Sequence, residues 1–184
     1  MASVLIPIAE GCEELEAVTI IDLLVRAGIT VVSAGLKEGP VTCSRGTVLV
    51  PSMTLDQALT QEYDMLVLPG GLPGADHLDN DSRIHQLLST MSQANKYTAA
   101  ICAAPKVLAS AGLLDNKKAT SYPGVIDKMD IPGMSYDSAA VVKDGYVITS
   151  RGPGTAMDFS LALIEVLVGE KIKNDVEKGL VRNG

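Results

Sequence analysis

Short apolar runs alternate with longer amphipathic stretches along most of the chain, and this alternation limits the choice of fold more than any other feature. The first run, residues 3–9 (SVLIPIA), is followed by a helical pattern over 12–28 that ends at Gly28. The order of strand, helix and strand then recurs, with Gly and Pro between the segments. Units of this kind build a mostly parallel sheet with helices on both faces. The sequence therefore predicts a doubly wound α/β sandwich.

The later segments fit the same architecture. The last long helical pattern carries Thr155 and Asp158 at the spacing of a capping box, and Gly169 follows it as a stop signal. Turn residues Arg45–Gly46 and Asp144–Gly145 predict two hairpins. We expect strands at 29–35, 63–71, 97–102 and 118–123, hairpins at 41–51 and 139–150, and helices at 81–95, 103–112 and 155–169.

Length and composition agree with one aliphatic core. A chain of 184 residues is long enough for one sizeable core and short for two, so residues 1–184 are expected to form a single domain. Hydrophobic residues make up 47% of the chain, with no Trp and one Phe. Val, Ile, Leu, Ala and Met must therefore fill the interior, which suits a parallel sheet covered by helices.

Charge and cysteine content exclude several classes of function. The formal net charge of −7 argues against binding to nucleic acid or to an anionic membrane surface. The first residues lack the basic segment of a signal peptide, and no later segment has the length of a membrane span, so we expect a cytoplasmic protein. Three cysteines without a CxxC pair indicate neither a disulfide framework nor a zinc site.

Four loops combine small residues with polar or reactive ones, at 9–16, 70–74, 102–105 and 150–155. Each follows a predicted strand, and function in such sheets gathers at the carboxyl ends of the strands. The simpler interpretation, that Gly and Pro only turn the chain, is favoured for the loop at 150–155 taken alone. Four such loops at one edge favour a functional site.

Cys102 ends a short apolar run and precedes a stretch of good helix formers. A tight turn from strand to helix would lift its side chain above the sheet, as in a nucleophile elbow, and the amides that open the helix would favour a thiolate and lower the thiol pKa. A buried, inert thiol is the alternative, because cysteines in apolar runs commonly pack as small hydrophobic residues. The residues alone leave both interpretations open.

Glu16 differs from the acids around it. Glu10, Glu13 and Glu14 fit solvated charges at a helix start, whereas Glu16 lies between Leu15 and an alanine where the apolar face begins. A carboxyl forced inward would have a raised pKa and, when protonated, could donate a hydrogen bond to a nearby thiolate.

These segments together resemble a known family. The stretches GCEELEAV, VLPGG, AAICAAP and TSRGPGTAMDFSLALIEVLVG, in this order, are similar to the ThiJ/PfpI superfamily, in the branch of the parkinsonism-associated protein deglycase and bacterial relatives labelled as thiazole monophosphate biosynthesis proteins. The similarity covers essentially the whole chain. It implies a flavodoxin-like sandwich and a homodimer with a reactive cysteine in each subunit.

The resemblance also assigns roles to particular residues. Cys102 matches the family's nucleophile, and Glu16 matches the carboxylic acid hydrogen-bonded to it. Gly71 and Ala103 match the positions whose backbone amides would form an oxyanion hole, where each donor is typically worth ~3 to 4 kcal/mol in a transition state.

Three further positions are carried over for the pocket or the dimer contact. Arg45 and Arg151 fall where the branch also has arginines, and Tyr122 stands where the branch often has a histidine before proline. Ala103 replaces the histidine that follows the cysteine in peptidase-like members, and the chain's two histidines, His77 and His85, precede Cys102 in a loop and helix of their own. A protease mechanism, which needs a base beside the nucleophile, is therefore not expected.

The resemblance implies a cysteine-dependent glyoxalase or protein deglycase that acts on methylglyoxal or glycated thiols and amines, without metal or organic cofactor. The alternative is a redox sensor or stress chaperone, because a reactive thiol beside Glu16 is also readily oxidised. Cys43 is expected to be a small buried residue near a dimer contact, while Cys12 is a candidate resolving thiol for an oxidised Cys102.

Overall fold

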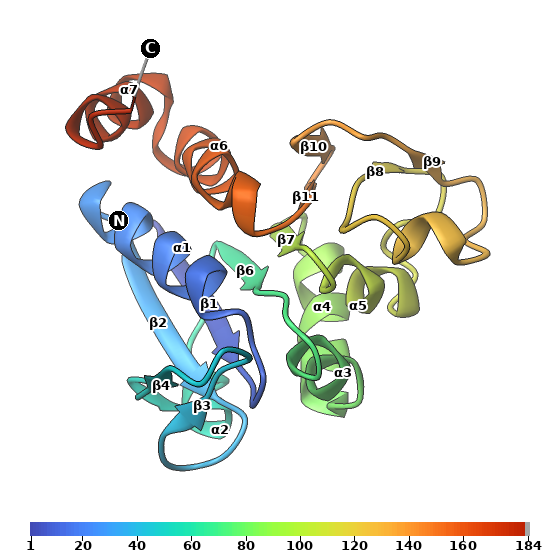
Figure 1. Cartoon of the computed structure of the whole chain (residues 1–184), viewed down its shortest axis with the longest axis horizontal. Helices are drawn as coiled ribbons and strands as arrows, with labels where there is room; N and C mark the ends of the chain where they lie inside the picture. Colours follow the sequence, from blue (N-terminus) through green and yellow to red (C-terminus); the bar gives the residue numbers. More distant parts are fainter. Residues whose placement is uncertain (183–184) are drawn as a thin grey trace.

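The computed structural model describes residues 1–182 and is built around a seven-stranded sheet (Figure 1). The strand order is β10-β11-β7-β6-β1-β2-β5, and every neighbouring pair is parallel except the antiparallel pair β10–β11. The bounds are β1 Ser3–Ile8, β2 Thr30–Gly35, β5 Met53–Thr54, β6 Met65–Leu68, β7 Tyr97–Ile101, β10 Val141–Asp144 and β11 Val147–Ser150. The predicted α/β fold with a mostly parallel sheet and flanking helices is confirmed.

The central strands are apolar on both sides because both faces of the sheet are covered. In β1, Val4 and Ile6 pack into one hydrophobic cluster, and Leu5 packs into the other. β6 divides in the same way, with Val67 on the first side and Leu66 on the second. Successive side chains of a strand point to opposite faces, so a strand between two helical layers reads as a continuous apolar run.

Helices form one layer on each side of the sheet (Figure 1). α1 (Glu14–Arg26) and α6 (Ala156–Val168) pack side by side on one face, and α7 (Glu170–Gly179) packs against α6. The other face is covered by α2 (Leu55–Ala58), α3 (Gly74–Asp79), α4 (Ser82–Gln93) and α5 (Pro105–Ser110). No helix in the described part of the chain is long and apolar enough to cross a membrane.

Smaller elements lie outside the main sheet. The predicted hairpin at 41–51 forms from β3 (Val41–Thr42) and β4 (Val48–Leu49), which pair antiparallel. β8 (Lys118–Ala119) pairs with β9 (Ser135–Tyr136), and two short 3-10 helices cover Ile126–Lys128 and Pro153–Thr155. The sequence pattern did not predict β5, β9, α2 or α3, because elements of two to six residues are too short to show a period.

The prediction of a capping box at the start of α6 is wrong. Thr155 makes no side-chain cap to α6; its Oγ1 instead lies 2.7 Å from Ser150 Oγ and 3.1 Å from the backbone nitrogen of Gly152. Asp158 pairs with Arg182 at 2.7 Å. A short 3-10 turn precedes α6 and directs the Thr155 hydroxyl toward the end of β11. Thr155 therefore bonds to Ser150 and Gly152 and does not cap α6.

The four loops singled out in the sequence meet at the carboxyl edge of the sheet. The backbone N–H of Glu13 donates to Gly70 O at 2.9 Å, which joins the first loop to the second. The backbone N–H of Cys102 donates to Ser150 O at 3.0 Å, which joins the third loop to the end of β11. The prediction that these loops assemble at one edge is confirmed.

Candidate active site

Cys102 occupies a strained turn directly after β7. Its φ is +63°, a left-handed conformation that residues other than glycine rarely adopt. Both of its backbone polar groups are bound, because its N–H donates to Ser150 O and its carbonyl accepts from Tyr122 N–H at 2.9 Å. The residue is only partly buried. Such a turn lifts the thiol above the strand end, as expected of a nucleophile elbow.

Glu16 reaches the same place from the first turns of α1. The residue is fully buried, and its Oε2 accepts a hydrogen bond from Gly70 N–H at 2.8 Å. The other oxygen, Oε1, is buried with no nitrogen or oxygen partner in the described part of the chain. The Cys102 thiol is within hydrogen-bonding reach of this carboxyl. The side chains of Cys102 and Glu16, predicted to act together, are thus brought into contact.

Gly70 is the residue that makes this contact sterically feasible. A Cβ at position 70 would lie 2.6 Å from Cys102 Cβ and 2.8 Å from both Glu16 Oε2 and Ile101 O. The resemblance assigned a role only to Gly71, whereas Gly70 was expected only to open the loop at 70–74. The PGG stretch was the available signal, since a second glycine after a buried strand often marks a close approach of two chain segments.

Gly71 is also required, for a different reason. Its φ is +87°, and a Cβ there would collide with Glu13 N, with Gly11 O at 2.6 Å and with Cys12 C at 2.7 Å. The loop after β6 therefore rests directly on the loop after β1. The Gly71 and Ala103 N–H groups lie close enough to the Cys102 sulfur to lower the pKa of its thiol by hydrogen bonding.

The electrostatics of the pair differ from the sequence expectation of a lowered thiol pKa. Burial, followed by the Glu16 carboxylate, raises the pKa of Cys102 to about 12, although the amides of Gly71 and Ala103 oppose this. Burial raises the pKa of Glu16 to about 7, against the opposing hydrogen bonds from Gly70 and Cys102. The largest cause at both groups is burial, which disfavours a negative charge on either one, and the Glu16 carboxylate adds to the shift at Cys102. Near neutral pH, Glu16 can therefore accept the thiol proton when Cys102 attacks an electrophile.

Tyr122 and Arg151 border this pair. The Tyr122 backbone bonds to Cys102, its side chain is 52% exposed, and a Cβ on Gly152 would lie 3.3 Å from its ring. Arg151 directly follows β11, and its Nε is buried without a hydrogen-bond partner among the described residues. Both residues therefore come from segments that contact the Cys102 turn, whereas their assignment to a pocket or dimer contact stays a prediction.

Arg45, Cys12 and Cys43 belong to a neighbouring region. Arg45 lies in the turn between β3 and β4, where its backbone N–H donates to Glu14 Oε1 at 3.0 Å. Cys43 is 5% exposed and packs in the core, as expected of a small buried residue. Cys12 Sγ lies 3.5 Å from Cys43 Sγ. The thiol in contact with Cys12 is therefore that of Cys43, and its suggested role toward Cys102 stays a prediction.

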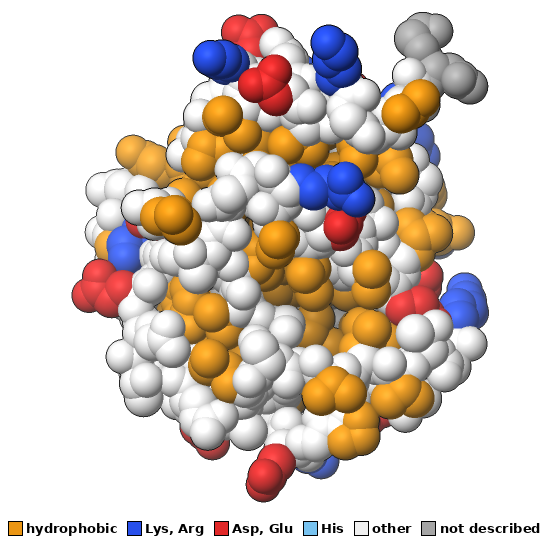
Figure 2. Space-filling view, turned by 90° about the vertical axis from the view of Figure 1, so that its left-hand side faces the viewer, with side chains coloured by type: hydrophobic (Ala, Val, Ile, Leu, Met, Phe, Trp, Pro, Cys, Tyr) orange, Lys and Arg blue, Asp and Glu red, His pale blue; other side chains and the backbone are white. Residues whose placement is uncertain are grey.

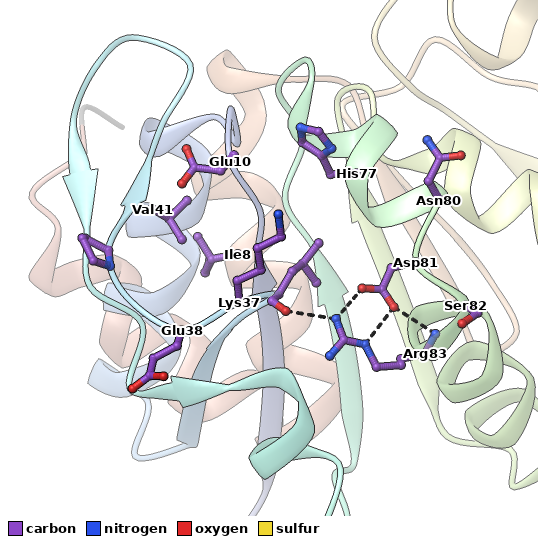
Figure 3. Close-up of a pocket in the computed structure, with 12 residues that line it drawn as sticks. Ile8, Glu10, Lys37, Glu38, Val41, His77, Asn80, Asp81, Ser82 and Arg83 are labelled. Carbon is purple, nitrogen blue, oxygen red and sulfur yellow. Dashed lines mark hydrogen bonds and ion pairs between the residues drawn. The ribbon is translucent and has the colours of Figure 1, made fainter.

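A cavity of about 430 Å³ opens between the ends of β1 and β2 and the start of α4 (Figure 3). Arg83 on its wall is held by Asp81 at 2.6 Å and by Leu36 O at 3.0 Å, so its charge is already paired. His77 lines the cavity from α3 rather than from the loop expected, and His85 on α4 lies 2.7 Å from Asp79 O. None of the predicted site residues lines this cavity.

Comparison with protein-family models matches residues 2–166 to the DJ-1/PfpI family. The protein dj-1beta of Drosophila melanogaster is 43% identical over 181 residues, covering 97% of this chain and 96% of its own. A Caenorhabditis elegans relative named glutathione-independent glyoxalase DJR-1.2 is 37% identical over 179 residues, covering 97% and 95%.

The structural comparison agrees. The crystal structure of Drosophila melanogaster DJ-1beta superposes with a TM-score of 0.94 at 42% identity, covering 100% of this chain and 99% of that one. An oxidised DJ-1 from Toxoplasma gondii superposes with a TM-score of 0.93 at 34% identity, covering both chains in full. With agreement in sequence, family model and fold along nearly the whole length, this chain belongs to the DJ-1/PfpI family, in its DJ-1 branch.

Proposed function

We propose that this protein is a cysteine-dependent glyoxalase and protein deglycase that uses Cys102 and Glu16 and needs no metal or organic cofactor. The observation that carries the proposal is the contact between a partly exposed thiol and a buried carboxyl whose pKa is raised to about 7, under two backbone N–H groups. The relative named as a glutathione-independent glyoxalase supports the same chemistry.

The first step would be attack of the Cys102 sulfur on the aldehyde carbon of methylglyoxal. The thiol proton moves to the Glu16 carboxylate as the carbon–sulfur bond forms. The aldehyde oxygen gains the negative charge, and the N–H groups of Gly71 and Ala103 are placed to stabilise it. The product is a hemithioacetal after the oxygen is protonated.

Glu16 would then move a proton between the two substrate carbons. Removal of the proton from the former aldehyde carbon gives an enediol, and return of a proton to the neighbouring carbon gives a thioester of lactate. Water hydrolyses the thioester, which releases lactate and restores the Cys102 thiol. A carboxyl with a pKa of about 7 suits this sequence because it can both accept and donate a proton near neutral pH.

Other members of the branch often have a histidine near the cysteine, and in this chain we propose that Glu16 carries the protons instead. Tyr122 stands at that position, and its backbone rather than its exposed phenol is bonded to Cys102. Glu16 is then the group in contact with the thiol that can carry protons. We propose that deglycation of thiols and amines follows the same addition, with the glycated carbonyl in place of free methylglyoxal.

The test is lactate formation from methylglyoxal in metal-free buffer. Cys102→Ser should abolish turnover, and Glu16→Gln should lower kcat by about 100-fold or more, because an amide cannot accept the proton. Glu10→Gln, which changes an exposed acid of the same loop, should retain wild-type turnover. Turnover that survives Cys102→Ser would contradict the proposal.

Redox sensing, with or without chaperone activity, is the second candidate, and one observation favours it. The Toxoplasma gondii relative was solved in an oxidised form, and here Glu16 and two amides surround a partly exposed sulfur that could hold oxidised oxygens as well. Absence of lactate formation together with selective oxidation of Cys102 by peroxide would favour this role over turnover. In either role we propose a cytoplasmic homodimer.

A further inference from the structure

Two cysteines lie in contact outside the proposed active site. Cys12 Sγ and Cys43 Sγ are 3.5 Å apart, although the residues are separated by 31 positions in sequence. Cys12 is 1% exposed and Cys43 5% exposed. The proposed chemistry at Cys102 uses neither thiol.

The backbone holds the two thiols in register. Gly11 N–H donates to Thr42 O at 2.8 Å, and Ser44 N–H donates to Cys12 O at 2.8 Å. These bonds fasten the loop after β1 to the β3–β4 turn on both sides of the cysteine pair. A disulfide bond is ~2.0 Å long, so the two sulfur atoms need to approach by only about 1.5 Å.

We propose that Cys12 and Cys43 form a second redox centre, a dithiol that peroxide converts to an intramolecular disulfide and that thiol reductants restore. This centre is separate from Cys102, and its chemistry does not depend on the proposed turnover.

The reaction balances with one hydrogen peroxide. Cys43, the more exposed thiol, attacks a peroxide oxygen; the O–O bond breaks, which gives a sulfenic acid and one water. Cys12 Sγ then attacks Cys43 Sγ, the S–O bond breaks, and the leaving hydroxide takes the Cys12 proton to form a second water. Two thiols thus lose two electrons and two protons to the peroxide.

The surroundings explain the order and the pace of these steps. Burial raises the pKa of both thiols, and Glu13 and Glu14 act in the same direction. The hydrogen bond between the thiols lowers the pKa of Cys43 but raises that of Cys12, so Cys43 ionises first. The pair should therefore stay reduced at low peroxide and oxidise slowly at higher peroxide.

A disulfide here would fasten the support of the active-site loop. The backbone of Cys12 lies directly beneath the loop after β6, where a Cβ on Gly71 would lie 2.7 Å from Cys12 C and one on Gly74 would lie 2.6 Å from Cys12 N. Ser44, next to Cys43, also donates to Glu13 Oε2 at 2.9 Å. Oxidation would thus tie the β3–β4 hairpin covalently to the chain that carries these contacts.

The experiment uses full-length Cys102→Ser protein, so that only Cys12 and Cys43 remain as thiols. After treatment with peroxide, we expect peptide mapping to show a Cys12–Cys43 link that dithiothreitol reverses. The oxidised form should melt at least about 4 °C above the reduced form, since the bond closes a long loop. This readout needs no turnover, so its failure is distinguishable from failure of the proposed glyoxalase.

A trivalent arsenical, phenylarsine oxide, supplies a second measurement on the same protein. It bridges adjacent thiols, so one equivalent should bind and protect both cysteines from later alkylation in denaturant. Cys12→Ala and Cys43→Ala in the same background should each lose the link and the bridging. Separate sulfenic or sulfinic acids without a Cys12–Cys43 link, or a Cys12–Cys102 link as the product in wild-type protein, would overturn the proposal.

Discussion

At the scale of single residues, the proposed chemistry depends on one proton shared between Cys102 and Glu16. The raised pKa of the thiol, about 12, means that the sulfur is protonated at neutral pH while Glu16 is half ionised at about pH 7. The reactivity of Cys102 should then depend on the ionisation of the Glu16 carboxyl rather than on the ionisation of the thiol. The carboxylate is the form that accepts a proton, so the reaction is favoured above the pKa of Glu16 and suppressed below it.

Alkylation of Cys102 by iodoacetamide tests this assignment. The rate should rise with pH through a midpoint near 7 as Glu16 loses its proton. In Glu16→Gln this midpoint should disappear, and the rate should rise only above pH 9, because burial still raises the thiol pKa above its ordinary value of 9.0. A midpoint near 7 that persists in Glu16→Gln would assign the titration to another group.

At the scale of elements, the site is built by loops that pack without side chains between them. The loop after β6 contacts the loop after β1 at Gly71 and the Cys102 turn at Gly70, each at distances where a methyl group would overlap its neighbours. Glu14 strengthens the adjoining contact, because its carboxylate accepts from the backbone of both Arg45 and Thr47. The amides that face the sulfur are therefore held by packing at several points.

Gly70→Ala should disable the site more than it destabilises the fold. The added Cβ would push against Cys102 Cβ and Glu16 Oε2, which separates the thiol from the carboxyl. We expect a fall in methylglyoxal turnover of at least about 10-fold, with a cost in stability of about 1 to 3 kcal/mol from overpacking.

The matched control is Gly154→Ala, since a Cβ at position 154 meets no atom within 4 Å. Turnover and thermal unfolding of the two variants, measured side by side, separate the steric effect from the general effect of replacing glycine. Equal turnover in the two variants would show that Gly70 does not set the geometry of the pair.

At the scale of the whole molecule, one face carries several exposed apolar side chains. Leu15, Val18 and Val25 lie on one side of α1 and are 49%, 46% and 55% exposed. Hydrophobic side chains gather across the side of the molecule on which α1 lies (Figure 2). Exposed apolar patches of this kind mark protein interfaces, which supports the proposed homodimer.

Val18→Lys should therefore dissociate the dimer. A charge at the centre of an apolar contact loses hydration without gaining a partner, so the variant should run as a monomer in size-exclusion chromatography with light scattering, while the wild type gives the mass of two chains. Met129→Lys, an exposed residue 38% accessible on another segment, should stay dimeric. A monomeric wild-type protein would remove the basis of this proposal.

The amino-acid sequence alone was enough to predict the helical layers, the mostly parallel sheet and the strand-to-helix turn at Cys102, but not the short elements β5, β9, α2 and α3. Apolar runs, helical periods and glycine stops are local signals, and they act within a few residues. The inward position of Glu16 was predictable for the same reason, because its place in the apolar stripe of α1 fixes its direction. The single-domain organisation over 1–184 stays a prediction, since residues 183–184 lie outside the described part.

Contacts between groups that are distant in the sequence, and their effects on each other's pKa, become visible only in the folded chain. The raised pKa of Cys102 depends on burial and on a carboxylate far away in sequence, whereas local reasoning from the turn had suggested the opposite shift. The need for glycine at position 70 and the contact between Cys12 and Cys43 likewise arise where separate loops pack together. Such contacts leave no periodic pattern in the sequence, because they depend on the three-dimensional closure of the sheet edge.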